Sequence, residues 1–245
     1  MEAKGIICIM TGTPPSDPET AERFYKWHDD VHILHLFEFK GMRKATNCRL
    51  IIDLEPLHPT DVKYPAFLTI FEYESKEASQ QYLTSPERAA ATKDAQSTWP
   101  PEVGGKKIWS VLYEPIKTFG NRTETKTKGI LNIIAGTPPS DPETVERFYK
   151  WHNDEHIHQL LRFKGIRKAT NYKLVTDLKP FYQTDINYPA FITILEYESK
   201  EAIQKYLTSP ERASAKEDGI ATWGEHIGAQ KIWSVLYEPT KIWER

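Results

Sequence analysis

Two histidines four residues apart are the first candidates for chemistry in this chain. His28 and His32 belong to the segment FYKWHDDVH, and the segment FYKWHNDEH carries His152 and His156 at the same spacing. Residues four apart lie on the same side of a helix, so each pair faces one direction. Because imidazole titrates near neutral pH, a histidine inside a pocket can accept and donate a proton there. The pattern leaves three interpretations open: acid–base catalysis or substrate orientation, a hydrogen-bonded histidine at a packed interface, and a metal site.

The residues around these pairs do not favour a metal. A catalytic zinc site needs a third protein ligand and often has Glu directly after the first histidine. Asp29 and Asn153 hold that place, and no Cys or His cluster lies nearby in the sequence. The usual signatures of nicotinamide, ATP and serine-hydrolase chemistry are missing as well. We therefore expect no metal and no cofactor.

The histidine segment occurs twice because the chain repeats itself. Gly5–Lys117 recurs without a gap as Gly129–Lys241, each residue 124 positions further on. Roughly two-thirds of the paired positions are identical, and the period is too long for a solenoid or a propeller blade. The repeat predicts two domain-sized units, residues 1–117 and 129–245, joined by a linker at 118–128.

Hydrophobic periodicity predicts the same elements in each unit. In the first unit it predicts strands at 4–11, 42–54, 66–74 and 107–114, a long helix to about Glu38, and a second helix from Ser75 that restarts near Pro86. Ser16 and Glu19 have the spacing of a capping box at the start of the first helix. The order β-α-β-β-α-β is that of a ferredoxin-like unit, whose sheet is covered by helices on one face only. We expect the two bare faces to pack together, giving a fused α+β barrel with a pseudo-dimeric arrangement.

Composition narrows the partners and the compartment. The net charge is −2 with both signs interspersed, which does not favour nucleic acid or a membrane surface as a partner. The N-terminus has no signal-peptide pattern and no apolar run is long enough to span a bilayer, so we expect a cytoplasmic protein. Cys8 and Cys48 have no counterparts in the second unit, which predicts free, buried thiols rather than a disulfide.

The histidine segment also resembles the first-helix signature of EthD-like proteins. These belong to the dimeric α+β-barrel superfamily, in which an aromatic-rich helix carries a W/H-x-x-x-H element. The element order extends the resemblance over both units. It implies a small-molecule pocket between the helices and the sheet of each unit. Related proteins include polyketide cyclases, decarboxylating or dehydrating enzymes, and cofactor-free monooxygenases of aromatic polyketides.

The candidate site residues combine imidazoles, aromatic rings and cations. We expect His32 and His156 to act as acid and base, with His28 and His152 orienting the substrate. Aromatic rings would shape the cavity, and a guanidinium could hold a carboxylate or phenolate oxygen. The candidate substrate-binding residues are Trp27, Trp151, Arg43, Arg167, Tyr73, Tyr197, Tyr64 and Tyr188. A phenol and an imidazole together could remove an α-proton and protonate an enolate.

The leading hypothesis is therefore a cofactor-independent enzyme of secondary metabolism, of lyase or isomerase type. It would cyclise, dehydrate or decarboxylate a hydrophobic, carbonyl-rich substrate resembling a polyketide. One alternative is a cofactor-free monooxygenase of an aromatic polyketide, a second is a non-catalytic ligand-binding or stress-response barrel, and a third is a haem bound by a barrel histidine. We expect a monomer with an internal pseudo-twofold axis, with further dimerisation left open. Differences such as Asp29 against Asn153 leave two interpretations open: the two pockets have diverged, or the sequence has drifted on a solvent-exposed helix edge.

Overall fold

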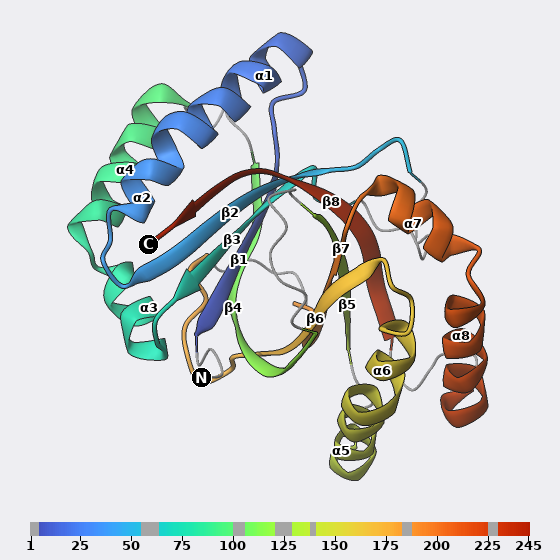
Figure 1. The fold of residues 1–245 in the computed structure, drawn as a ribbon. Helices are drawn as coiled ribbons and strands as arrows, with labels where there is room; N and C mark the ends of the chain where they lie inside the picture. The colour runs from blue at the N-terminus through green and yellow to red at the C-terminus, as the bar shows by residue number, and fades with distance from the viewer. Residues whose placement is uncertain are drawn as a thin grey trace.

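In the computed structural model, eight antiparallel strands close into one barrel and the helices lie outside it (Figure 1). The structure describes residues 5–54, 64–99, 106–120, 129–137, 141–182, 188–224 and 230–245. The order of strands around the barrel is β1-β3-β2-β8-β5-β7-β6-β4. Helices α1–α4 cover one side of the barrel and α5–α8 cover the other. The predicted α+β barrel is confirmed.

The elements follow the predicted order. The strands are β1 Ile6–Thr13, β2 Met42–Leu50, β3 Phe67–Tyr73, β4 Lys106–Phe119, β5 Ile130–Thr137, β6 Ile166–Leu174, β7 Phe191–Tyr197 and β8 Gln230–Glu244. The helices are α1 Pro18–Trp27, α2 Ile33–Phe37, α3 Lys76–Leu83, α4 Pro86–Thr98, α5 Pro142–Trp151, α6 Ile157–Leu160, α7 Lys200–Leu207 and α8 Pro210–Trp223, with π-helical turns η1 His28–His32 and η2 His152–His156. None of the described helices has the length and apolar character needed to cross a bilayer.

Strands β4 and β8 close the barrel because each is long enough to pair with both halves of the chain. β4 pairs with β1 as far as Tyr113 and from there with β6. β8 does the same with β5 and β2, changing partner at Tyr237. Pro115 and Pro239 lie at register shifts of these seams, where a missing N–H is tolerated. β4 therefore ends at Phe119, two residues inside the predicted linker, and residues 121–128 lie outside the described residues.

Side chains of successive strand residues alternate between two apolar layers. On β1, Ile7 and Ile9 point into the barrel interior, while Ile6, Cys8 and Met10 pack against the helices. Because both faces are covered, the strand is buried from Ile6 to Gly12, an apolar run rather than an alternating one. Cys8 and Cys48 are buried thiols that take part in no disulfide among the described residues, as predicted.

The histidine helix differs from the prediction in its cap and in its middle. The N-cap is Asp17, whose carboxylate accepts the backbone N–H of Thr20 at 2.8 Å, so the predicted cap at Ser16 is one residue early. Pro18 directly after Asp17 suits the first helical position. The helix then widens into a π turn at His28–His32, where the N–H of Ile33 bonds to the carbonyl of His28. An α-helix turns about 100° per residue and would place a residue five positions on about 140° away. The wide turn instead brings His32 over Trp27.

Two glycines have a positive φ. One lies at the β4–β6 seam and the other provides a control for how closely that seam is packed. Gly120 has φ +79°, and a Cβ there would lie 2.5 Å from the carbonyl oxygen of Arg167; Gly224 has φ +74° and open space around its Cβ position. Both alanine variants carry the strain of a positive φ, about 1–3 kcal/mol, including Gly224 with its ψ of −173°. We expect Gly120→Ala to lower the unfolding free energy by at least about 1 kcal/mol more than Gly224→Ala, because overpacking adds about 1–3 kcal/mol. Urea denaturation measures both, and equal losses would contradict the close approach at the seam.

Candidate active site

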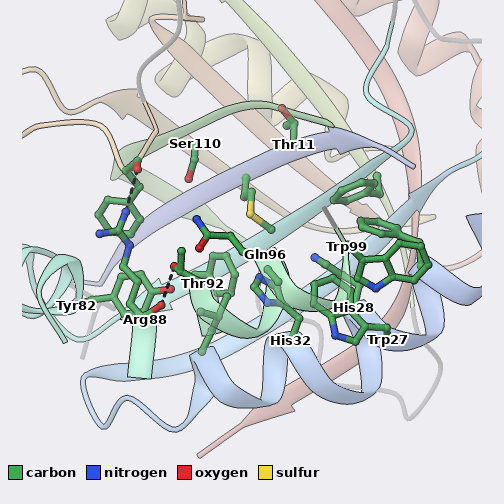
Figure 2. Close-up of a pocket in the computed structure, with 17 residues that line it drawn as sticks. Thr11, Trp27, His28, His32, Tyr82, Arg88, Thr92, Gln96, Trp99 and Ser110 are labelled. Carbon is green, nitrogen blue, oxygen red and sulfur yellow. Dashed lines mark hydrogen bonds between the residues drawn. The ribbon is translucent and has the colours of Figure 1, made fainter. Parts of the chain in front are cut away.

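A cavity of about 270 Å³ lies outside the barrel in the first half of the chain (Figure 2). Its walls are the helix α1-η1-α2, helix α4 and the outward-facing side chains of β1, β3 and β4. Apolar residues dominate the lining: Met10, Phe24, Trp27, Leu36, Phe67, Phe71, Ala95, Trp99 and Phe181. The polar lining residues are Thr11, His28, His32, Tyr82, Arg88, Thr92, Gln96 and Ser110. The volume is close to the lower end of small-molecule pockets, about 300–1,000 Å³, so a small ligand fits best.

A buried amide holds His28 in place. Asn47 on β2 donates from Nδ2 to Asp29 Oδ1 at 2.6 Å and lies 3.2 Å from Nδ1 of His28. Its Oδ1 accepts the hydroxyl of Thr69 on β3 at 2.7 Å. Because a carboxylate only accepts, the NH₂ group of Asn47 must face Asp29 and therefore also faces Nδ1 of His28. The neutral ring then carries its proton on Nε2, where it can donate to a ligand.

His32 is held by stacking. Its ring lies 4.9 Å from the Trp27 ring at an interplanar angle of 28°, and 5.6 Å from the His28 ring. The indole N–H of Trp27 donates to Asp94 of α4 at 3.0 Å. This bond ties Trp27, on which His32 stacks, to helix α4. Trp99 at the end of α4 lies 6.0 Å from Trp27, so the imidazole pair adjoins an aromatic cluster. The hydrogen bond and the stack together give the two imidazoles defined positions on one wall.

The second half repeats this arrangement. Nδ2 of Asn171 lies 3.1 Å from Nδ1 of His152 and donates to Asn153 Oδ1 at 2.6 Å, and Thr193 donates to Asn171 at 2.8 Å. His156 stacks on Trp151 at 4.7 Å. Trp151 in turn donates to Asp218 at 3.2 Å. The four predicted imidazoles are therefore placed alike in pairs, with His28 and His152 both buried.

The two halves differ in charge beside the anchored histidine. Asp29 stands where the second half has Asn153, and its Oδ1 lies 3.8 Å from Nδ1 of His28. Burial raises the pKa of Asp29. His28 and the amide of Asn47, both beside the carboxylate, lower it by a larger amount, so its pKa lies below the ordinary value. A carboxylate and an amide oxygen thus fill the same position in the two networks, with different charge.

The structure places the other predicted residues outside the lining of this cavity. Arg43 is exposed on β2, and Arg167 lies 4.0 Å from Glu198 in an ion pair on the other half. Tyr73 and Tyr197 are buried between sheet and helices, and burial raises the pKa of both phenols well above the ordinary value. Tyr64 and Tyr188 pack against the barrel interior, on the opposite face of the sheet from the cavity. Of the twelve predicted site residues, the cavity brings together Trp27, His28 and His32.

Several lining residues were missed from the sequence. Asn47 and Thr69 lie outside the lining but hold His28 in place. Thr69 could have been noticed as a polar residue within the apolar run of β3, whereas the strand around Asn47 is mostly polar and gave no signal. Arg88, Thr92 and Gln96 carried no such signal, because the face that α4 turns toward the cavity depends on how the helix packs. Phe181 comes from the second half of the chain, and nothing in its sequence neighbourhood points to the first-half cavity.

Comparison with known proteins identifies the fold. No protein-family model and no curated protein sequence matches the chain. Among solved structures, an anthrone oxidase-like protein has a TM-score of 0.62 at 15% identity, covering 99% of this chain and 94% of the other. A candidate monooxygenase from Fusobacterium nucleatum subsp. nucleatum has 0.58 at 10% identity, covering 100% and 96%. A chlorite dismutase mutant from Candidatus Nitrospira defluvii has 0.51 at 12% identity, covering 98% and 93%.

The chain has the dimeric α+β-barrel fold. The matched chains are covered almost to their full length, so the likeness concerns the whole barrel. At identities of 15% or less it concerns the fold alone, and the chemistry has to be argued from the cavity. Among the described residues, no three His, Cys, Asp or Glu side chains gather as metal ligands.

The amide network predicts the tautomer of two histidines. We expect neutral His28 and His152 to carry the proton on Nε2, because Nδ1 of each accepts from an asparagine NH₂ group. Long-range ¹H–¹⁵N correlation spectra of the imidazole rings at pH 8 measure this directly. Asn47→Leu should release His28 into a mixture of tautomers and leave His152 unchanged. An Nδ1–H form of His28 in the unaltered protein would contradict the network.

Asp29 predicts a pH-dependent contribution to stability. Its folded pKa is lowered, so the contribution is present above the ordinary carboxyl pKa and is lost as the pH falls through the folded value. We expect Asp29→Asn, which copies the second half, to lower the unfolding free energy at pH 7 by about 1 kcal/mol, the difference between charged and neutral hydrogen bonds. Urea denaturation from pH 7 to pH 3 should show this difference shrinking.

The neighbouring Asp30 provides the control. It pairs with Lys241 at 2.7 Å but is half exposed, so Asp30→Asn should change stability by less than about 0.5 kcal/mol. A loss from Asp29→Asn that stays constant down to pH 3 would show that the charge of Asp29 is not the cause.

Proposed function

We propose that this chain is an enzyme that removes a proton from a carbon next to a carbonyl group, in a small apolar substrate bound in the first-half cavity. One observation carries the proposal: two adjacent imidazoles line a largely apolar cavity, and a buried amide anchors one of them. Aromatic and aliphatic walls keep water away from such a pair, which strengthens its hydrogen bonds to a ligand. Acid–base catalysis by a placed imidazole supplies about 10²–10⁴-fold in rate.

The two imidazoles have different roles in this proposal. The Nε2–H of His28 donates to the substrate carbonyl oxygen and stabilises the negative charge that develops there. His32, which stacks on Trp27, accepts the proton from the adjacent carbon. The result is an enolate next to an imidazolium, and His32 can return the proton to a later intermediate. The pair thus performs the acid and base steps of one reaction.

The enolate has two fates that fit the cavity. It can attack a second carbonyl group or lead to loss of water or carbon dioxide, which gives cyclisation, dehydration or decarboxylation. It can also react with dioxygen. For a ketone whose CH₂ becomes a second carbonyl, one dioxygen is consumed and water is the other product. The likeness to an anthrone oxidase-like protein supports the oxygen-dependent route as an alternative.

We further propose that the chain is a fusion of two EthD-like, ferredoxin-like units, residues 1–117 and 129–245. The constant offset of 124 residues supports this. So do the paired hydrogen bonds around His28 and His152, which agree to about 0.1 Å. Which half turns over substrate is then a question for single variants.

The proposal predicts loss of proton abstraction without His32 and His156. We expect the double variant His32→Ala/His156→Ala to exchange the α-protons of 2-tetralone in D₂O about 10²–10⁴-fold more slowly than the unaltered protein. Proton NMR measures the exchange, and the two single variants assign the activity to a half. His35→Ala is the matched control, because His35 lies on the same helix outside the cavity lining.

Dioxygen uptake separates the two fates. Consumption of one dioxygen per anthrone, abolished in the double variant, supports the oxygen-dependent route. Exchange without dioxygen uptake supports the cyclase, dehydratase or decarboxylase route. If the unaltered protein and the double variant exchange 2-tetralone at the same rate, the chain is a ligand-binding barrel and the catalytic proposal is wrong.

A further inference from the structure

Among the described residues that line it, the cavity wall carries one permanent positive charge and no negative charge. Within the part of the chain that the structure describes, the titratable lining side chains are His28, His32, Tyr82 and Arg88, with no Asp, Glu or Lys among them. Burial raises the pKa of Tyr82, so its phenol stays neutral. Arg88 is charged at every relevant pH. A wall of this kind favours a ligand that brings a negative charge.

Arg88 is held without an acidic partner. Its Nη1 donates to the carbonyl of Leu83 at 2.6 Å and its Nη2 to the carbonyl of Phe181 at 3.3 Å. Among the described arginines, Arg49 and Arg167 form ion pairs, and none of the described carboxylates pairs with Arg88. A guanidinium has five N–H donors in a rigid fork, and two carbonyls leave several for a ligand. The two carbonyls therefore aim the guanidinium without neutralising it.

Arg88 stands apart from the imidazole pair along the cavity. Arg88, Thr92 and Gln96 follow one another at intervals of four on one face of α4. At 1.5 Å per residue, Arg88 and Gln96 are about 12 Å apart along the helix axis. Figure 2 shows Arg88 and Tyr82 toward one end of the cavity, His28, Trp27 and Trp99 toward the other, and Thr92 and Gln96 between them. A ligand that reaches both ends is elongated.

We propose that Arg88 binds a carboxylate or phenolate oxygen at the end of the substrate remote from the reacting carbon. This rests on the proposed function, and it narrows the substrate to an elongated aromatic ketone with an acidic group at its far end. Phe181 is part of the same assignment: its carbonyl orients Arg88 and its ring lies 5.4 Å from Tyr82. The second half of the chain therefore helps to select the substrate of the first-half cavity.

Calorimetric titration with 2-naphthoate and its neutral isostere 2-naphthamide tests this without turnover. We expect the unaltered protein at pH 8 to bind the carboxylate at least about 10-fold more tightly, the effect of one charge-assisted hydrogen bond. Arg88→Gln should remove that preference and leave the amide affinity within about two-fold. Arg88→Lys should keep part of the preference, since it retains the charge but loses the fork.

Two matched variants separate binding from folding. Arg43→Gln removes an exposed arginine outside the cavity lining and should leave both affinities unchanged. Arg212→Gln removes the equivalent arginine of the second half, whose Nη1 donates to the carbonyl of Leu207 at 3.0 Å. The melting temperature of this variant shows how much the loss of such a hydrogen bond near the start of the helix destabilises the fold.

Each outcome decides the assignment. Equal affinities for the two probes in the unaltered protein overturn it while the histidine-based proposal stands. A carboxylate preference that persists in Arg88→Gln also overturns it, because the imidazoles would then hold the anion. Failure of both probes to bind overturns the assignment and the proposed cavity function together.

Discussion

The pairing of β4 and β8 with both halves of the chain is the constraint on which the rest depends. A four-stranded sheet with helices on one face leaves its other face and its edges exposed, and exposed edges invite aggregation. Here β4 continues from β1 to β6 and β8 from β5 to β2, so the described strands form a closed ring. Tyr113 and Tyr237, where these strands change partner, are fully buried and donate to the carbonyls of Pro189 and Pro65.

Closure also determines where a ligand can bind. The barrel interior is filled by apolar side chains from both halves, including Ile9, Val111, Ile133 and Val235. Binding space therefore arises between the sheet and the helices. The anchor of His28 depends on the same closure, because Asn47 sits on β2 opposite Lys241 of β8, and its carbonyl accepts the hydroxyl of Thr240. A strand of one half holds the histidine, and its pairing with the other half holds the strand.

How much could be predicted from the sequence follows from the range of each interaction. The element order and the barrel depend on local periodicity and on the repeat, both visible in the chain. The π turn was missed because no residue type at 28–32 signals it, and the stacking of Trp27 on His32 that accompanies it is visible only in the folded chain. The predicted Arg43 lies one residue into β2 on an exposed position, while Arg88 reaches the cavity. Arg88 reaches the cavity because of how α4 packs and because Phe181 approaches it. Both are contacts between residues far apart in the sequence, so the sequence does not distinguish Arg88 from Arg43.

The two halves show how a repeated arrangement can change its charge with little change in its geometry. Replacing the carboxylate of Asp29 by the amide of Asn153 leaves the hydrogen bond to the anchoring asparagine at 2.6 Å in both halves. An amide oxygen fills the place of a carboxylate oxygen, so packing is kept while a charge beside the histidine is lost. On α4 and α8, Gln96 corresponds to Ile220 and Thr92 to Lys216, which changes polarity on an otherwise similar helix face. Because the barrel core and the seams do not contain these positions, they can diverge without weakening closure. These three differences therefore change charge and polarity beside the histidine pair and on the helix next to it.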